Sequence, residues 1–212
     1  VIFVNTISAL LLLYGLQYFC RRQSVPWLAL AVSIPYLVIV VGMGYQRQSI
    51  AIGFELLALS VIFDSQLSTY YRTFKYVLFI LFGALFHKTV LIMLPLCLLL
   101  DGQNKYVIYP VLILFLIGFY NAIFANDIDL MVYSYIEGKK NSDGALIRLL
   151  MTACLGGFYF IVRNKVDTPN LEHKVILMGT QLSLLLIALV PFYSTLVDRV
   201  SLYLIPLQLM IV

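Results

Sequence analysis

The sequence predicts an all-α fold, a polytopic bundle of transmembrane helices. Of its 212 residues, 62% are hydrophobic and only 11% are charged, whereas a soluble domain carries about 25% charged residues. The apolar residues form long continuous runs, and a membrane-spanning helix needs roughly 20 such residues. Strands of a transmembrane barrel would alternate apolar and polar residues, and these runs do not alternate.

The apolar runs predict about eight or nine membrane segments in series, separated by polar or basic stretches. The expected segments cover residues 1–20, 26–41, 48–63, 74–100, 106–124, 146–162, 175–192 and 200 onward. The chain starts and ends inside apolar runs. We therefore expect one integral membrane domain, residues 1–212, that belongs to a longer protein with further helices at both ends.

The distribution of Lys and Arg predicts the orientation, because basic loops stay in the cytoplasm. The basic loops are those at Arg21–Arg22, at Arg72 and Lys75, and at Arg163, Lys165 and Lys174. The loops at Lys75 and Arg163 then lie on the same side, so an even number of membrane crossings must separate them. If residues 74–100 form one crossing, the number of crossings between these loops is three. A short or re-entrant helix pair that turns near His87 and Lys88 gives four, so we predict such a pair.

Cysteine usage and net charge exclude several classes of function. Cys20, Cys97 and Cys154 lie far apart in apolar runs without metal-ligand spacing, so we interpret them as small lipid-facing or core residues. The formal net charge of +4 reflects basic loops and membrane topology rather than nucleic-acid binding. We expect no metal, no cofactor and no nucleic-acid partner.

This topology gathers basic residues on the non-cytoplasmic face, beside a long loop at residues 125–145. The basic residues are Arg47, His87, Lys88, Arg148 and Arg199. A cation at bilayer depth costs about 2.5–3.5 kcal/mol on insertion scales, so intramembrane cations are candidates for a functional role. The loop carries Asp127, Asp129, Glu137 and Asp143, which we interpret as mostly solvated, with Asp143 also a candidate helix cap.

Three of these positions have both a structural and a functional interpretation. Arg47 is either a helix-end anchor or a guanidinium that grips a phosphate, and the adjacent Gln48 favours the phosphate. His87 is either a hydrogen-bonded turn residue or a general base. Asp198 and Arg199 form either a local ion pair or a second phosphate contact.

Glu55 is the candidate acid inside the membrane. It lies seven residues after Gln48, on the same helix face. A lone intramembrane carboxylate is a functional candidate by default, and the alternative is a Glu that is hydrogen-bonded inside the bundle. We rank His87 first and Glu55 second as the catalytic base.

Two sequence motifs resemble the EpsG family. Arg47-Gln48-Ser49-Ile50-Ala51 follows a glycine-containing turn, and Leu85-Phe86-His87-Lys88-Thr89 opens a new apolar arm. A later segment, Asp198-Arg199-x-Ser201-x-Tyr203, is similar to the C-terminal arginine and tyrosine segment of that family. The motifs occur in the family's order and span most of the chain.

The resemblance implies a Wzy-like polymerase of bacterial surface polysaccharides in the cytoplasmic (inner) membrane. Such an enzyme transfers a growing glycan from undecaprenyl diphosphate onto the next lipid-linked repeat unit, at the outer leaflet, without a metal. The resemblance also implies that arginines bind the diphosphate and that a base activates the acceptor hydroxyl. The expected partners are the undecaprenyl-diphosphate-linked glycan, membrane lipid and possible further polysaccharide-assembly proteins. The expected substrate contacts are Arg47, Gln48, Lys88, Arg148 and Arg199.

Two other functions use the same basic face. A transporter or flippase of lipid-linked sugars would bind its cargo there, but it should also show inverted repeats and broken helices in both halves. Only one break, at His87, is visible in the sequence. A membrane acyltransferase would need a histidine that faces an acyl donor, usually from the cytoplasm, whereas our topology places His87 outside.

Overall fold

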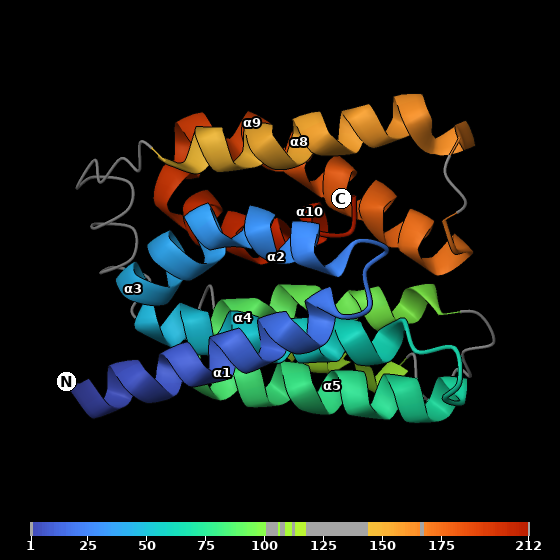
Figure 1. Ribbon diagram of the computed structural model, residues 1–212, viewed down its shortest axis with the longest axis horizontal. Coiled ribbons are helices and arrows are strands. Elements are labelled where there is room, and N and C mark those ends of the chain that lie inside the picture. Colours follow the sequence, from blue (N-terminus) through green and yellow to red (C-terminus); the bar gives the residue numbers. More distant parts are fainter. Residues whose placement is uncertain are drawn as a thin grey trace. The chain divides into compact units, whose positions relative to one another are not determined.

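The computed structural model describes residues 2–100, 106, 109–111, 113–117, 144–165 and 168–211. Every regular element in these ranges is a helix (Figure 1), which confirms the predicted all-α class. The chain divides into two compact units. The first unit is Val1–Phe115 together with Val212, and the second unit is Leu116–Ile211. Of the long loop predicted at residues 125–145, residues 125–143 lie outside the described residues.

The first unit is built around a buried central helix. Its elements are α1 (Ile2–Cys20), α2 (Pro26–Ser33), η1 (Ile34–Val41), α3 (Gly42–Gly44), α4 (Gln46–Ile62), α5 (Thr69–Phe86) and η2 (Lys88–Leu99). Pro26 begins α2, a position where the missing N–H of proline costs nothing. Residues 48–62 of α4 are buried except Phe54, because α1 and α5 pack on opposite sides of it.

Glycines allow α1 to approach α4 closely. A Cβ added to Gly53 would lie 2.7 Å from the carbonyl oxygen of Leu11, and one added to Gly15 would overlap the carbonyl oxygen of Gly53. Small residues at such crossings let helix backbones touch, which is the usual way for membrane helices to associate. The apolar sequence of α4 thus forms the core of the unit rather than a lipid-facing surface.

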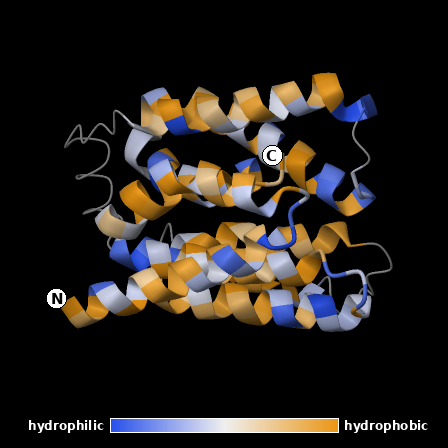
Figure 2. Ribbon diagram, in the orientation of Figure 1, coloured by the Kyte–Doolittle hydropathy of each residue, from blue (hydrophilic) through white to orange (hydrophobic). Residues whose placement is uncertain are grey.

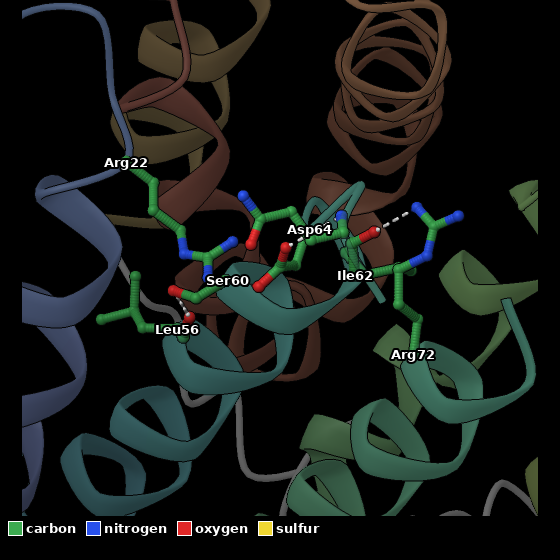
Figure 3. Close-up of polar contacts among 7 residues, drawn as sticks. Arg22, Leu56, Ser60, Ile62, Asp64 and Arg72 are labelled. Carbon is green, nitrogen blue, oxygen red and sulfur yellow. Dashed lines mark hydrogen bonds and ion pairs between the residues drawn. The ribbon is translucent and has the colours of Figure 1, made fainter. Parts of the chain in front are cut away.

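The loops after α1 and after α4 meet at one end of the first unit, which we name the Arg22 end. An oxygen of Asp64 lies 2.7 Å from Nη2 of Arg22. On the other side, Nη1 of Arg72 donates to the carbonyl oxygen of Ile62 at 3.3 Å (Figure 3). The hydrogen bond from Arg22 lowers the pKa of Asp64 below its ordinary value of 3.8. Two of the predicted cytoplasmic loops therefore lie at the same end.

The predicted turn at His87 is present. Helix α5 ends at Phe86, His87 is extended at φ −149° and ψ 110°, and the 3₁₀ helix η2 begins at Lys88. The Tyr76 hydroxyl donates to the carbonyl oxygen of Met93 at 2.7 Å, so η2 runs back beside α5. A 3₁₀ helix rises about 2 Å per residue, so these 12 residues extend on the order of 24 Å, further than the same residues would in an α-helix.

The second unit is a pair of antiparallel helices followed by a buried returning segment. Its elements are α8 (Gly144–Val162), η4 (Arg163–Lys165), α9 (Asn170–Ser201), η5 (Leu202–Leu204) and α10 (Ile205–Gln208). The two long helices pack through Gly156, where an added Cβ would lie 2.8 Å from the Cβ of Thr180. Figure 2 shows long apolar stretches along both helices, and large side chains such as Ile161 and Phe192 are exposed.

Helix α9 continues beyond Phe192 to Ser201, although its candidate membrane span ends at Phe192, where the sequence predicts the end of a segment. Thr180 packs on Gly156, and Asp198 contacts Arg148. Thr180 and Asp198 are 18 positions apart, about 27 Å along a straight helix, whereas Gly156 and Arg148 are 8 positions apart, about 12 Å. The helix must therefore bend, and it contains Pro191, the usual cause of a kink.

Four described helices are long and apolar enough to cross a membrane, and η2 is a shorter apolar helix. The four are Ile2–Cys20, Pro26–Gly44, Gly144–Lys165 and Asn170–Phe192. The multi-pass membrane character is thus confirmed, while the predicted count of eight or nine segments is not. Helix α4 has only 17 residues, the residues after Phe192 turn back, and most of residues 106–124 are not described.

Candidate functional site

The residues predicted for the site divide between the two units. Arg47, Gln48, Glu55, His87 and Lys88 belong to the first unit. Arg148 and Arg199 belong to the second unit.

Arg47 and Gln48 lie in the first turn of α4 and have different environments. The helix begins at Gln46, after Tyr45 leaves the helical conformation at φ −128° and ψ 62°. The Arg47 side chain is exposed, whereas Gln48 is buried at 5% exposure. The exposed guanidinium is able to bind an anion, and the helix N-terminus adds a partial positive charge to the same place. Gln48 faces the protein interior instead.

His87 is held by its own turn. Its backbone N–H donates to the carbonyl oxygen of Gly83 at 3.0 Å. Its Nδ1 lies 2.6 Å from Oγ1 of Thr89. The ring is half-buried, and the neighbouring Lys88 is exposed. When Nδ1 carries the proton and donates it to the hydroxyl, Nε2 keeps a lone pair and can act as a base.

The first turn of α4 and the last turn of α5 lie at the same end of the first unit, opposite the Arg22 end; we name it the Arg47 end. The Phe54 ring stacks on the Phe86 ring with centroids 6.1 Å apart. A Cβ added to Gly83 would lie 3.3 Å from the carbonyl oxygen of Ala51. Arg47 lies one turn before Ala51, and His87 follows Phe86 directly. The structure thus brings the two EpsG-like motifs to one end of the unit.

Glu55 lies at the centre of the first unit and is 0% exposed. Neither carboxyl oxygen has a hydrogen-bond partner among the residues that the structure describes. An ionised carboxylate in such a place lacks the compensation that a buried charge needs. Its burial also separates it from the surface on which Arg47 lies.

In the second unit, Arg148 of α8 forms an ion pair with Asp198 of α9. Both residues are buried, at 8% and 6% exposure. The adjacent Arg199 is exposed. The sequence left open whether Asp198 and Arg199 pair locally or make a second phosphate contact, and the structure shows a contact of the Asp198 carboxylate with Arg148. The signal for this pair was available in the sequence, because a lone charge in an apolar segment requires a partner.

A second set of buried hydrogen bonds surrounds the ion pair. Thr152 Oγ1 donates to the carbonyl oxygen of Arg148 at 3.2 Å and accepts from Nε2 of Gln208 at 2.8 Å. Ser201 Oγ donates to the carbonyl oxygen of Asp198 at 2.7 Å. Thr152 and Gln208 were not among the residues predicted for the site, and Ser201 was named only as part of the C-terminal motif.

The opposite end of the second unit carries the third predicted cytoplasmic loop. The Tyr159 hydroxyl lies 2.7 Å from Oγ1 of Thr168 and 3.0 Å from Nδ1 of His173. Arg163 lies over the Phe160 ring, 5.7 Å from its centroid. Arg148 and Arg199 are thus at one end of this unit, while Arg163 and its basic neighbours are at the other. Within the described ranges, no group of three or more His, Cys, Asp and Glu side chains could hold a metal ion.

The sequence model of the EpsG family matches residues 1–212, the whole chain. The chain belongs to the EpsG family. Comparisons with curated proteins and with solved structures found no match. Membership confirms the resemblance carried by the two motifs, and it agrees with the multi-pass helical architecture. The chain is accordingly a polysaccharide polymerase-like membrane protein.

Within this EpsG family member, each unit has one end with exposed or half-buried basic residues of the motifs. In the first unit these are Arg47, His87 and Lys88, and in the second unit Arg199. Exposed guanidinium groups favour phosphate, which they bind bidentately. The residues of the first unit alone are suited to an anionic leaving group with a histidine at the same end.

Proposed function

We propose that this EpsG family protein is a membrane glycosyltransferase. It polymerises undecaprenyl-diphosphate-linked oligosaccharide repeat units into exopolysaccharide, O-antigen or capsule, at the outer face of the bacterial cytoplasmic membrane. The observation that carries the proposal is the position of the two family motifs. Arg47 and His87 lie at one end of the first unit, away from the basic Arg22 end that the charge rule assigns to the cytoplasm.

The proposed reaction requires a cation that stabilises the diphosphate leaving group and a base that removes the proton of the acceptor hydroxyl. The bond from the anomeric carbon to the diphosphate oxygen breaks, and the acceptor hydroxyl oxygen bonds to that carbon. Arg47, with Lys88 as a further contact at the same end of the first unit, stabilises the departing diphosphate through charge-assisted hydrogen bonds of about 1.5–3 kcal/mol each. The acceptor proton passes to Nε2 of His87.

The burial pattern favours His87 over Glu55 as the base. His87 is half-buried in a turn, whereas Glu55 is 0% exposed inside the unit. A general base must come within hydrogen-bond reach of the proton that it removes. Gln48 is also buried, and in this proposal it supports the first turn of α4 while Arg47 makes the phosphate contact.

Replacing Arg47 with Ala in cells that carry the full-length gene tests the proposal. Loss of one such donor lowers the rate by about 10²–10³-fold, so gels should show single repeat units at the surface and no long chains. Arg21→Ala is the matched control, since Arg21 is an exposed arginine at the opposite end, and it should leave chain length unchanged. Immunoblots must show equal protein amounts in both variants.

Two results would argue against the proposal. Normal long chains in Arg47→Ala would remove this residue from the site. Repeat units trapped inside the cell, with no glycan on the outer leaflet, would favour a flippase of lipid-linked sugars.

A further inference from the structure

The buried ion pair of the second unit joins two helices that are far apart in the sequence. Nη1 of Arg148 donates to Oδ1 of Asp198, 50 positions along the chain. A Cβ added to Gly144 would lie 3.0 Å from Nη2 of Arg148, so the guanidinium folds back along the first turn of α8. Asp198 therefore fixes the direction of a cation at the helix end, rather than in the middle of the unit.

Helix packing in the second unit rests on other contacts. Gly156 packs directly on Thr180, and Gly179 packs on Leu207. Compared with apolar residues of similar volume, a buried ion pair adds little stability, because its desolvation offsets its attraction. The packing of α8 against α9 therefore does not require charged residues at positions 148 and 198. Buried charges in a membrane segment that are not needed for packing indicate a functional role.

Neighbouring hydrogen bonds fix the backbone under both charged residues. Thr152 bonds the carbonyl oxygen of Arg148 and is itself held by Gln208, while Ser201 bonds the carbonyl oxygen of Asp198. A functional side chain needs such a supporting shell to stay within about 0.5 Å of its productive position. Arg148 has this shell in the described structure.

We infer that Asp198 is a positioning residue that orients Arg148 toward the diphosphate of the lipid-linked substrate. The inference rests on the proposed glycosyltransferase function. A guanidinium has five N–H donors, so it can hold the carboxylate and a phosphate oxygen at the same time. Arg199, which is exposed beside Asp198, is then a second cation at the same end of the unit.

The test measures initial polymerisation rates in membranes that contain the full-length protein, at several concentrations of lipid-linked repeat unit taken from polymerase-deficient cells. Asp198→Asn removes the charge and keeps the shape. We expect kcat per mole of protein to fall at least about tenfold, with KM within about twofold, because misplacement by about 1 Å costs up to 100-fold in rate. Asp198→Glu should recover part of the loss. Ser183→Ala is the matched control, since buried Ser183 bonds only its own helix at Gly179 in the described contacts, and it should keep the wild-type rate.

The reversed pair, Arg148→Asp with Asp198→Arg, distinguishes a role of Asp198 in orienting Arg148 from a role in joining α8 to α9. It also provides the test if the Asp198→Asn protein fails to accumulate. It keeps an ion pair between α8 and α9 but moves the cation to the other helix. Normal protein amounts and detergent melting temperature without polymerisation would support the inference. Polymerisation at the wild-type rate by the reversed pair, or by Asp198→Asn, would overturn it. Wild-type membranes that fail to polymerise would instead contradict the proposed function itself.

Discussion

At the scale of single residues, the hydroxyl of Thr89 decides what His87 can do. A hydroxyl bonded to one nitrogen of an imidazole holds the ring in one direction, and the other nitrogen can act as a base only when the hydroxyl accepts that hydrogen bond. Here Oγ1 of Thr89 lies 2.6 Å from Nδ1, in a turn that also fixes the histidine backbone. For His87 to act as a base through Nε2, Oγ1 of Thr89 must accept a hydrogen bond from the N–H at Nδ1.

Thr89→Val removes this hydroxyl and keeps the branched shape. We predict that kcat for polymerisation falls by about tenfold or more, within the 10²–10⁴-fold that a general base contributes. Thr89→Ser, the matched control, should stay close to the wild type. Rates of both variants across pH 5–9, normalised to protein amount, check this. A Thr89→Val enzyme with unchanged rate and pH profile would show that the hydroxyl does not assist the histidine.

The sequence predicted the residues of the first unit better than the pairing in the second. Arg47 and His87 were linked by a topological argument, and the structure places them at one end. Asp198 and Arg199 were considered together because they are adjacent. Consecutive residues on a helix do not face each other, and accordingly one is buried against Arg148 while the other is exposed. The sequence indicates that each of these buried charges needs a partner, but the pairing of Asp198 with Arg148, 50 positions away, follows only from how α8 and α9 pack.

At the scale of elements, the even number of crossings required between the basic loops predicted the turn between α5 and η2. It did not predict that the residues after the turn form a 3₁₀ helix. Lys88–Leu99 winds as a 3₁₀ helix with Pro95 inside, where in an α-helix the proline ring would clash with the carbonyl four residues earlier. The bend of α9 was not predicted. The sequence predicted two segments, residues 175–192 and 200 onward, whereas one helix bends near Pro191 and its buried Asp198 pairs with Arg148.

Adjacent glycines of α8 give a sharp test of the packing between α8 and α9. A Cβ at Gly156 would lie 2.8 Å from both Cβ and Cγ2 of Thr180, whereas one at Gly157 meets nothing within 4 Å. Rotating Thr180 cannot relieve a clash with its own Cβ. We predict that Gly156→Ala lowers stability by about 1–3 kcal/mol, while Gly157→Ala leaves it nearly unchanged. Thermal unfolding in detergent measures both, and equal melting temperatures for the two variants would contradict this packing.

At the scale of the whole molecule, membrane orientation follows from the basic loops. We predict that Arg21→Cys faces the cytoplasm and Lys88→Cys faces outward, both in a variant whose Cys20, Cys97 and Cys154 are changed to Ala. A membrane-impermeant maleimide should label position 88 in intact spheroplasts and position 21 only after lysis. Labelling of position 21 in intact spheroplasts, with position 88 protected, would reverse the topology and revive a cytoplasmic acyltransferase.

The number of membrane segments was the least predictable property. Apolar runs alone do not distinguish a lipid-facing helix from a buried one, and the segment predicted at residues 48–63 forms the buried helix α4, which at 17 residues is shorter than the four candidate spans. Residues 200–209, in the last predicted segment, are likewise buried. Hydropathy measures the preference of a residue for leaving water, and an apolar residue meets that preference in lipid and in a protein core alike.

The most direct measurement is polymerisation by the purified full-length protein in liposomes that contain undecaprenyl-diphosphate-linked repeat units. The account predicts a ladder of longer glycans, with one undecaprenyl diphosphate released for each glycosidic bond formed, and loss of both products in Arg47→Ala. If repeat units cross the bilayer without becoming longer, or if neither product forms with active substrate, the protein is not the polymerase proposed here.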